Sequence, residues 1–390
     1  MSRTNLWPTI ICLTLMSFTL ISSEFMPVAL LTPIGRELGM TEGQTGQAIA
    51  VSGFFAVVTS LFSNTVFARF NRKHVVMFYT VVMIVSGVAV SFAPNAAVFM
   101  AGRALIGASI GGFFSLSASI VARIATGKDL IGIFAWIQGG CAVATVIAQP
   151  LGSFLGGWIG WRGAFFIVVP CGILALVLQA IALPSVPGGG AMPVGRTMGM
   201  LKRKTFSIGM GAMMCFFIGQ FALSTYLRPY LEDVTHLSLN SLSLTLFALG
   251  LAGLLGTMVI GRVVQWAPYG ILIAAPALMA VVALGLIGLG HLAFAVVPLL
   301  VVWGFVTAPN PVAWNSWMAR TIPDDLEPGG AMLVALIQTS ITLAAFAGGL
   351  LYDTIGWQGA FLCSSLAFGA SALIGNVLRI RAAAPRFARG

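Results

Sequence analysis

The sequence has very little charge, and that absence excludes an ordinary soluble protein. Only 8% of its 390 residues are Asp, Glu, Lys or Arg, whereas 58% are hydrophobic. A typical soluble domain carries about 25% charged residues, and these cover its surface. A membrane-spanning helix needs about 20 mainly apolar residues, so this length accommodates about a dozen spans and no sizeable soluble domain. We therefore expect an all-α membrane protein with about twelve transmembrane helices.

Motifs for enzymatic or ATP-driven work are also missing. The chain has no GxxxxGK[ST] phosphate loop and no HExxH, and no GxSxG spacing or paired acidic cluster in it suggests an enzyme. Its five cysteines lie in apolar segments without CxxC spacing, which favours packing roles over disulfides or metal ligation. We expect no enzyme, no metal and no cofactor, and an ion gradient as the energy source.

Acidic residues are scarce, and the excess of basic residues has a pattern. Ten acidic residues stand against twenty basic ones, for a formal charge of +10. The basic residues lie in short loops between apolar runs, which indicates the positive-inside rule rather than nucleic-acid binding. With the N-terminus inside, twelve spans put both termini in the cytoplasm. The cytoplasmic side then holds Arg3, Arg69, Arg72, Lys73, Arg123, Lys128, Arg196, Lys202, Arg203, Lys204, Arg262, Arg320, Arg379, Arg381, Arg386 and Arg389.

Apolar runs divided by turn residues predict two six-helix halves. The first run continues through Leu31 without a small-residue cleavage site, so we expect a span rather than a signal peptide. Proline, glycine and a basic cluster make 184–205 a cytoplasmic linker between halves at 1–183 and 206–390. A weak internal repeat supports two halves, since GWRGAF at 160–165 resembles GWQGAF at 356–361. The predicted spans are 7–32, 45–67, 74–93, 96–122, 130–158, 163–183, 206–230, 239–261, 270–289, 292–317, 330–352 and 357–379.

Two ionisable residues are predicted deep in the membrane. Glu24 lies in the first span, and the low-dielectric interior favours the neutral form of a carboxyl, so Glu24 is the candidate proton carrier. Pro27 frees a backbone carbonyl nearby and can kink the helix. Arg103 in the fourth span needs an acceptor, either Glu24 or a polar group of a neighbouring helix. Gly107 and Gly111 share one face of that span and allow close helix approach. The alternatives are a static carboxyl kept for packing and an arginine that snorkels to the surface.

The second half holds candidate solute-binding side chains. Gln220 and Tyr226 place hydrogen-bonding groups in the seventh span, and Arg228 near its end either gates or faces lipid headgroups. In the tenth span two prolines are predicted to break the helix beside groups that could stack on and hydrogen-bond a ring-shaped solute. These are Asn310, Trp314 and Asn315, although tryptophans there also suit the aromatic belt. Further mid-span polar candidates, each of which also suits a helix–helix hydrogen bond, are Gln138, Gln149 and Gln338.

These residues resemble the drug/proton antiporter branch of the major facilitator superfamily across the whole chain. EFMPVALL at 24–31 is similar to the EFxPVxLL stretch of its sugar and nucleoside exporters, and Arg103 with Gly107 resembles the fourth-helix arginine motif. The segment from Pro150 to Arg162 resembles the antiporter motif. The loop at 64–73 keeps the basic Arg69 and Arg72 of the family's loop motif, but Asn64, Ala68 and Asn71 replace its usual glycines and acid.

A narrower likeness is to the bacterial purine ribonucleoside efflux pumps, and it includes GGF at 111–113 with Phe113. The resemblance implies export of nucleosides such as inosine and guanosine in exchange for protons, by a monomer in the bacterial inner membrane. Multidrug or sugar efflux on the same fold is the alternative, and a non-transporting membrane sensor is a third.

Overall fold

The chain is almost entirely helical over the residues that the computed structural model describes, which are 6–124, 127–188 and 198–383. No strand occurs within these ranges. Twelve segments there are long and apolar enough to cross a membrane, judged by length and composition. The prediction of an all-α protein with twelve spans is confirmed. The linker residues 189–197 lie outside the described ranges, as do the basic residues Arg3, Arg386 and Arg389.

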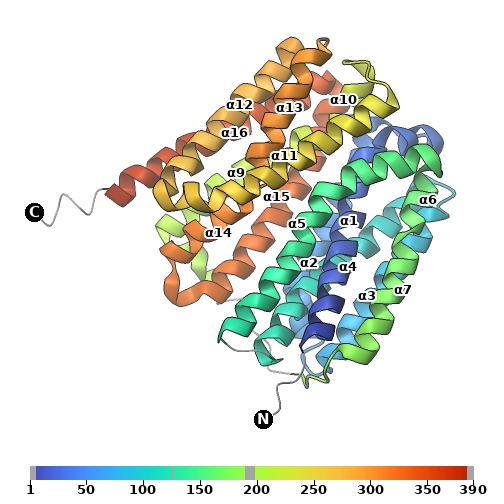
Figure 1. Cartoon of the computed structure of the whole chain (residues 1–390), viewed down its shortest axis with the longest axis vertical. Helices are drawn as coiled ribbons and strands as arrows, with labels where there is room; N and C mark the ends of the chain where they lie inside the picture. The colour runs from blue at the N-terminus through green and yellow to red at the C-terminus, as the bar shows by residue number, and fades with distance from the viewer. Residues whose placement is uncertain (1–5, 125–126, 189–197, 384–390) are drawn as a thin grey trace, which may run out of the picture. The chain divides into compact units, whose positions relative to one another are not determined.

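The helices of Figure 1 have the following bounds. The first part of the chain forms α1 (Trp7–Leu38), α2 (Glu42–Val66), α3 (Arg72–Ser91), α4 (Ala96–Ile124), α5 (Gly127–Trp158), α6 (Gly160–Phe166) and α7 (Val168–Ala182). The second part forms η1 (Met200–Lys202), α9 (Lys204–Ser224), α10 (Leu227–Asp233), α11 (Leu239–Trp266), α12 (Pro268–Leu289), α13 (Ala293–Thr307), α14 (Asn310–Thr321), η2 (Pro323–Asp325), α15 (Leu326–Ile355) and α16 (Trp357–Ala383).

Three of the spans consist of two helices with a short break. The tenth span breaks between α13 and α14, which confirms the prediction made from Pro309 and Pro311. The other two breaks separate α6 from α7 and α9 from α10, and Pro170 or Pro229 lies in the first turn of the helix that follows. Proline suits a first turn because the missing N–H would have no helical acceptor there.

The chain forms two compact units, and we describe each by itself. Met1–Met40 and Val51–Met192 make up the first, and Thr41–Ala50 and Pro193–Gly390 make up the second. Helix α2 therefore belongs to both, because its first turns pack with the second unit and the rest packs with the first. The residue boundaries predicted for the halves and the linker stay a prediction.

The first unit is organised around the pair α1 and α5, which lie side by side in Figure 1. Glycines of α5 meet α1 at three levels, with Gly140 against Ser17, Gly152 against Met26 and Gly156 against Leu30. Such small residues let membrane helices approach closely without a hydrophobic driving force. Ser17 Oγ also donates to the carbonyl of Ile137, at 3.1 Å.

The second unit contains an antiparallel pair, α9 and α16, whereas α1 and α5 run parallel. Ser364 Oγ donates to the Gly219 carbonyl at 2.6 Å, and Ser371 Oγ donates to the Ala212 carbonyl at 2.8 Å. Helix α12 packs along the other side of α16 (Figure 1). The two serine bonds set the register of α9 against α16.

Candidate functional site

Arg103 is the most deeply buried cation in the described part of the first unit, and its guanidinium binds the backbone of α1. The side chain is fully buried. Its Nη1 donates to the carbonyl of Ser23 at 2.9 Å, and its Nη2 donates to the carbonyl of Glu24 and to Ser52 Oγ, both at 3.1 Å.

Pro27 explains why the Ser23 carbonyl is available. In a regular helix that carbonyl would accept the N–H four residues later, but residue 27 is proline and has no N–H. Helix α1 nevertheless runs unbroken through Pro27. A buried carbonyl needs a partner, and Arg103 supplies it. The sequence correctly indicated a freed carbonyl near Glu24, and the structure identifies the group that binds it.

Glu24 itself lies in the same buried region. Its side chain is 1% exposed. Arg103 Nη2 donates to the backbone carbonyl of Glu24, so this cation lies beside the residue. A carboxyl held between a buried cation and an apolar helix can change its protonation state with small shifts of its surroundings. The geometry therefore suits a proton carrier.

Gly107 and Gly111 face α2 at very close range. A Cβ added to Gly107 would collide with the carbonyl oxygen of Ser52, and one added to Gly111 would collide with that of Ala56. Only glycine allows this approach of α4 to α2. The close approach also brings Ser52 within reach of Arg103, so the glycine face positions the polar cluster.

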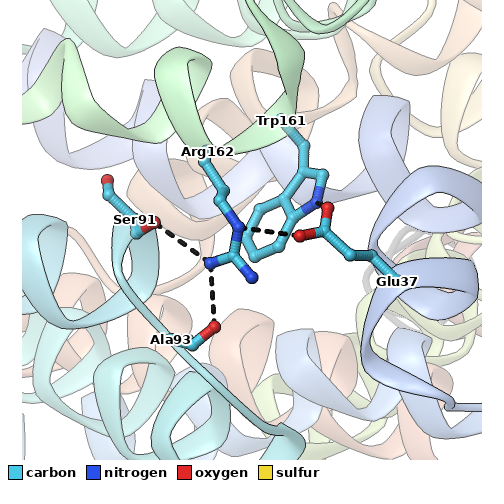
Figure 2. A network of polar contacts seen from close by, with 5 residues as sticks. All are labelled: Glu37, Ser91, Ala93, Trp161 and Arg162. Carbon is cyan, nitrogen blue, oxygen red and sulfur yellow. Dashed lines mark hydrogen bonds and ion pairs between the residues drawn. The ribbon is translucent and has the colours of Figure 1, made fainter.

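A second polar network joins α1, α3 and α6 (Figure 2). The Glu37 carboxylate accepts a hydrogen bond of 2.5 Å from Trp161 Nε1 and an ion pair of 2.9 Å from Arg162 Nε. Arg162 Nη1 also donates to the carbonyls of Ser91 and Ala93 at the end of α3. The sequence reasoning missed Glu37, and the Trp161-Arg162 pair in the repeated GW motif was the signal that pointed to this region. Glu37 is half exposed and fully engaged in holding helix ends together, which is a structural role.

In the second unit, α14 carries a face of buried polar groups. Asn310, Trp314 and Trp317 recur at helical spacing on that face, and all three are buried. The Asn310 amide donates to the Val306 carbonyl at 2.7 Å, across the proline break. Asn310 Oδ1 and the two indole N–H groups have no hydrogen-bond partner in the described part of the chain, and neither does Gln220 Oε1 on α9. Buried unsatisfied groups are uncommon, so this face is the candidate solute-binding surface of the second unit.

Tyr226 occupies the break between α9 and α10. It is fully buried, its hydroxyl donates to the Ala345 carbonyl at 2.9 Å, and its ring stacks on Tyr352. A Cβ at Gly46 would collide with this hydroxyl. Tyr226 thus packs where the first turns of α2 meet α9 and α15 within the second unit.

Asp353 on α15 caps the start of α2. Its carboxylate accepts from Thr41 Oγ1 at 2.7 Å and from the Gly43 N–H at 3.0 Å. Thr41 and Gln44 also bond each other's backbone N–H groups, which is a capping box. The Thr41-x-x-Gln44 spacing marks this helix start in the sequence, but nothing local predicts that Asp353, over 300 positions later, binds it.

The other predicted site residues are spread over both units. Phe113 is buried in the hydrophobic core of the first unit, against Phe114. Arg228 is buried and forms an ion pair of 2.9 Å with Glu232, one turn later. Asn315 is exposed and bonds the Pro311 carbonyl, Gln338 is half-buried in α15, and the side chain of Gln138 lies outside the described part.

The two predicted arginines between α2 and α3 differ in burial. Arg69 is exposed, whereas Arg72 is buried at the start of α3. The backbone N–H of Arg72 donates to the Val186 carbonyl, and the Asn71 amide donates to Ser185 Oγ. The first residues of the predicted linker therefore pack on this loop, with Asn71 in the place of the usual glycine. Pro150 lies within α5 two residues before Gly152, which meets α1.

Comparisons with known proteins agree with this architecture. The sequence profile of the Major Facilitator Superfamily matches residues 10–339. The chain is 45% identical over 383 residues to the transcription regulatory protein OpdE of Pseudomonas aeruginosa, covering 97% of this chain and 95% of that protein. It is 35% identical over 350 residues to the purine ribonucleoside efflux pump NepI of Salmonella typhimurium, covering 90% of this chain and 88% of that protein. A crystal structure of a D-xylose-proton symporter has the same fold, with a TM-score of 0.76 at 15% identity over 96% of this chain and 97% of that one.

Proposed function

Because the chain belongs to the major facilitator superfamily, and is therefore a membrane transporter and not an enzyme, we propose that it exports purine ribonucleosides such as inosine and guanosine in exchange for protons. The 35% identity to a purine ribonucleoside efflux pump supports this solute class. Glu24 would carry the proton, and Arg103 would modulate the proton affinity of the Glu24 carboxyl. Transport would proceed by alternating access in a monomer, with both termini on the cytoplasmic side of the bacterial inner membrane.

The observation that carries the solute class is the set of orphaned polar atoms in the second unit. Gln220 Oε1 and Asn310 Oδ1 are acceptors, and the Trp314 and Trp317 indoles are donors. A nucleoside brings both donors and acceptors on a flat ring, so it can satisfy such a set and stack on the indoles. A lipophilic cation would leave the indole N–H groups unsatisfied.

The test is pH-gradient-driven transport by purified protein in proteoliposomes, with inosine, a sugar and a cationic dye as parallel solutes. We expect inosine transport that collapses when the gradient is dissipated. Trp314→Phe keeps an aromatic ring, although a smaller one, and removes the N–H, and we expect about tenfold weaker inosine affinity. Trp136→Phe is the matched control, because Trp136 is 51% exposed. Transport of the dye or the sugar alone would favour the multidrug or sugar alternative.

A sensor is the second candidate, and one observation favours it. The relative with 45% identity is named a transcription regulatory protein. A major facilitator protein without transport activity could influence transcription by binding its solute. In that case the purified protein would bind a nucleoside but would retain preloaded solute in proteoliposomes under every gradient.

A further inference from the structure

The second unit contains a basic hollow at the ends of two of its spans. The hollow has a volume of about 400 Å³ and is lined by Leu201, Lys202, Lys204, Ser207, Ile208 and Arg381. Three of the six lining residues are cations, and none is an acid. Nothing in the transport cycle proposed above uses these residues.

The register of α9 and α16 explains why the cations meet. The serine bonds pair Ser371 with Ala212 in an antiparallel arrangement. The same register carried to the start of α9 brings the end of α16, which holds Arg381, level with Lys204. Lys204 starts the span on α9, and Arg381 ends the span on α16. The hollow is therefore at membrane-surface level, where headgroups lie.

Helix ends add to the positive charge of the hollow's lining. Arg203, between the two lysines in sequence, forms an ion pair with Asp325. No side chain caps the N-terminus of α9, so its first N–H groups add positive potential at the same place. Arg381 also has a favourable position at the C-terminal end of α16. That helix-end effect does not account for two lysines gathered beside it.

The apolar part of the lining completes the chemistry. Leu201 is exposed and Ile208 half-buried, and both lie beside the lysines. A phosphate group with attached acyl chains fits cations that lie beside apolar side chains, whereas free phosphate makes no use of the apolar side chains. We propose that this hollow binds the phosphate headgroup of an anionic phospholipid, with Lys202, Lys204 and Arg381 as its ligands.

The test is lipid binding by the full-length protein in detergent. Dioleoyl-phosphatidylglycerol is titrated in, with native mass spectrometry for occupancy and the thermal unfolding midpoint for stabilisation. Dioleoyl-phosphatidylcholine and inorganic phosphate are the parallel ligands. We expect binding and a raised midpoint with phosphatidylglycerol alone. Equal effects of phosphatidylcholine, or the full effect from inorganic phosphate, would overturn the lipid assignment.

Variants locate the site. Lys204→Gln with Arg381→Gln should weaken phosphatidylglycerol binding by about tenfold or more, because each basic residue near the surface contributes to attraction of an anionic lipid. The control, Arg36→Gln with Arg262→Gln, removes the same charge from two exposed positions and should bind as the wild type does. Lys204→Arg with Arg381→Lys keeps the charge and should retain binding. Equal losses in the neutralised variant and its control would contradict the proposal.

Discussion

At the scale of single residues, one side-chain hydrogen bond replaces a backbone hydrogen bond that a proline removes from a helix. Pro27 removes one backbone hydrogen bond from α1, and Arg103 on α4 replaces it. The sequence predicted both residues and their membrane depth, because ionisable residues and prolines stand out in apolar runs. It could not choose the acceptor, since the contact of α4 with α1 is tertiary and has no local signal in the sequence.

The Pro27–Arg103 interaction predicts a coupling that a double-mutant cycle can measure. Arg103→Leu leaves the Ser23 carbonyl buried without a donor, and we expect a loss of about 3–5 kcal/mol. Pro27→Ala restores the N–H, so Arg103→Leu should cost about 1 kcal/mol less in that background. Unfolding of purified protein in mixed micelles gives the four stabilities. Strictly additive effects would mean that Arg103 does not serve the freed carbonyl.

At the scale of elements, helix breaks and close approaches set the geometry. The break at Pro309–Pro311 was predictable because two prolines lie in one turn. The other two breaks were not, because Pro170 lies in an ordinary apolar run and Pro229 lies where the predicted seventh span already ends. The contact between α2 and α15 was also hidden. Its glycines, Gly43 and Gly349, each stand where a Cβ would press on the other's backbone, and only the folded chain pairs them.

The close approach of α4 to α2 predicts different tolerances at two glycines. Gly107→Ala should cost about 1–3 kcal/mol, because the new methyl would overlap the Ser52 carbonyl and force the helices apart. Gly139→Ala on α5 should be neutral or slightly stabilising, since nothing lies within 4 Å of its Cβ position. Thermal unfolding midpoints in detergent compare the two. Equal midpoints would show that α4 and α2 are not in such close contact.

The Asp353 cap predicts local opening of α2. Asp353→Asn removes the charge that Thr41 and the Gly43 N–H bind, at a cost of about 1 kcal/mol. We expect faster hydrogen exchange at residues 42–46, with the α1 segment around Pro27 unchanged. Asp233→Asn is the control, because Asp233 ends α10 and is not among the cap's partners. Unchanged exchange at 42–46 would contradict the cap.

At the scale of the whole molecule, composition alone sufficed for the class. Twelve apolar spans, few charges and basic loops predicted a polytopic α-helical protein, and the structure and the family match agree. The candidate solute site has a weaker signal in the sequence. The polar atoms of Gln220, Asn310 and Trp314 are buried without hydrogen-bond partners, and this is what marks them as candidates. Such burial depends on tertiary packing and not on local sequence pattern.

The distribution of basic residues predicts the orientation. A green fluorescent protein fused after Gly390 should be fluorescent, and alkaline phosphatase at the same place should be inactive, because a cytoplasmic C-terminus supports only the first reporter. An active phosphatase fusion together with a non-fluorescent protein fusion would show that the C-terminus lies on the opposite side of the membrane.

The central claim is that the buried carboxyl of Glu24 couples proton movement to solute movement. The most direct measurement is inosine-driven proton release or uptake in proteoliposomes, with wild type, Glu24→Gln and Glu37→Gln compared. Glu37 is the matched control, because it is an acid on the same helix whose carboxylate is held by Trp161 and Arg162. We predict that Glu24→Gln still binds inosine but moves no protons, while Glu37→Gln remains coupled. Coupled proton movement in Glu24→Gln at the wild-type rate would contradict the account.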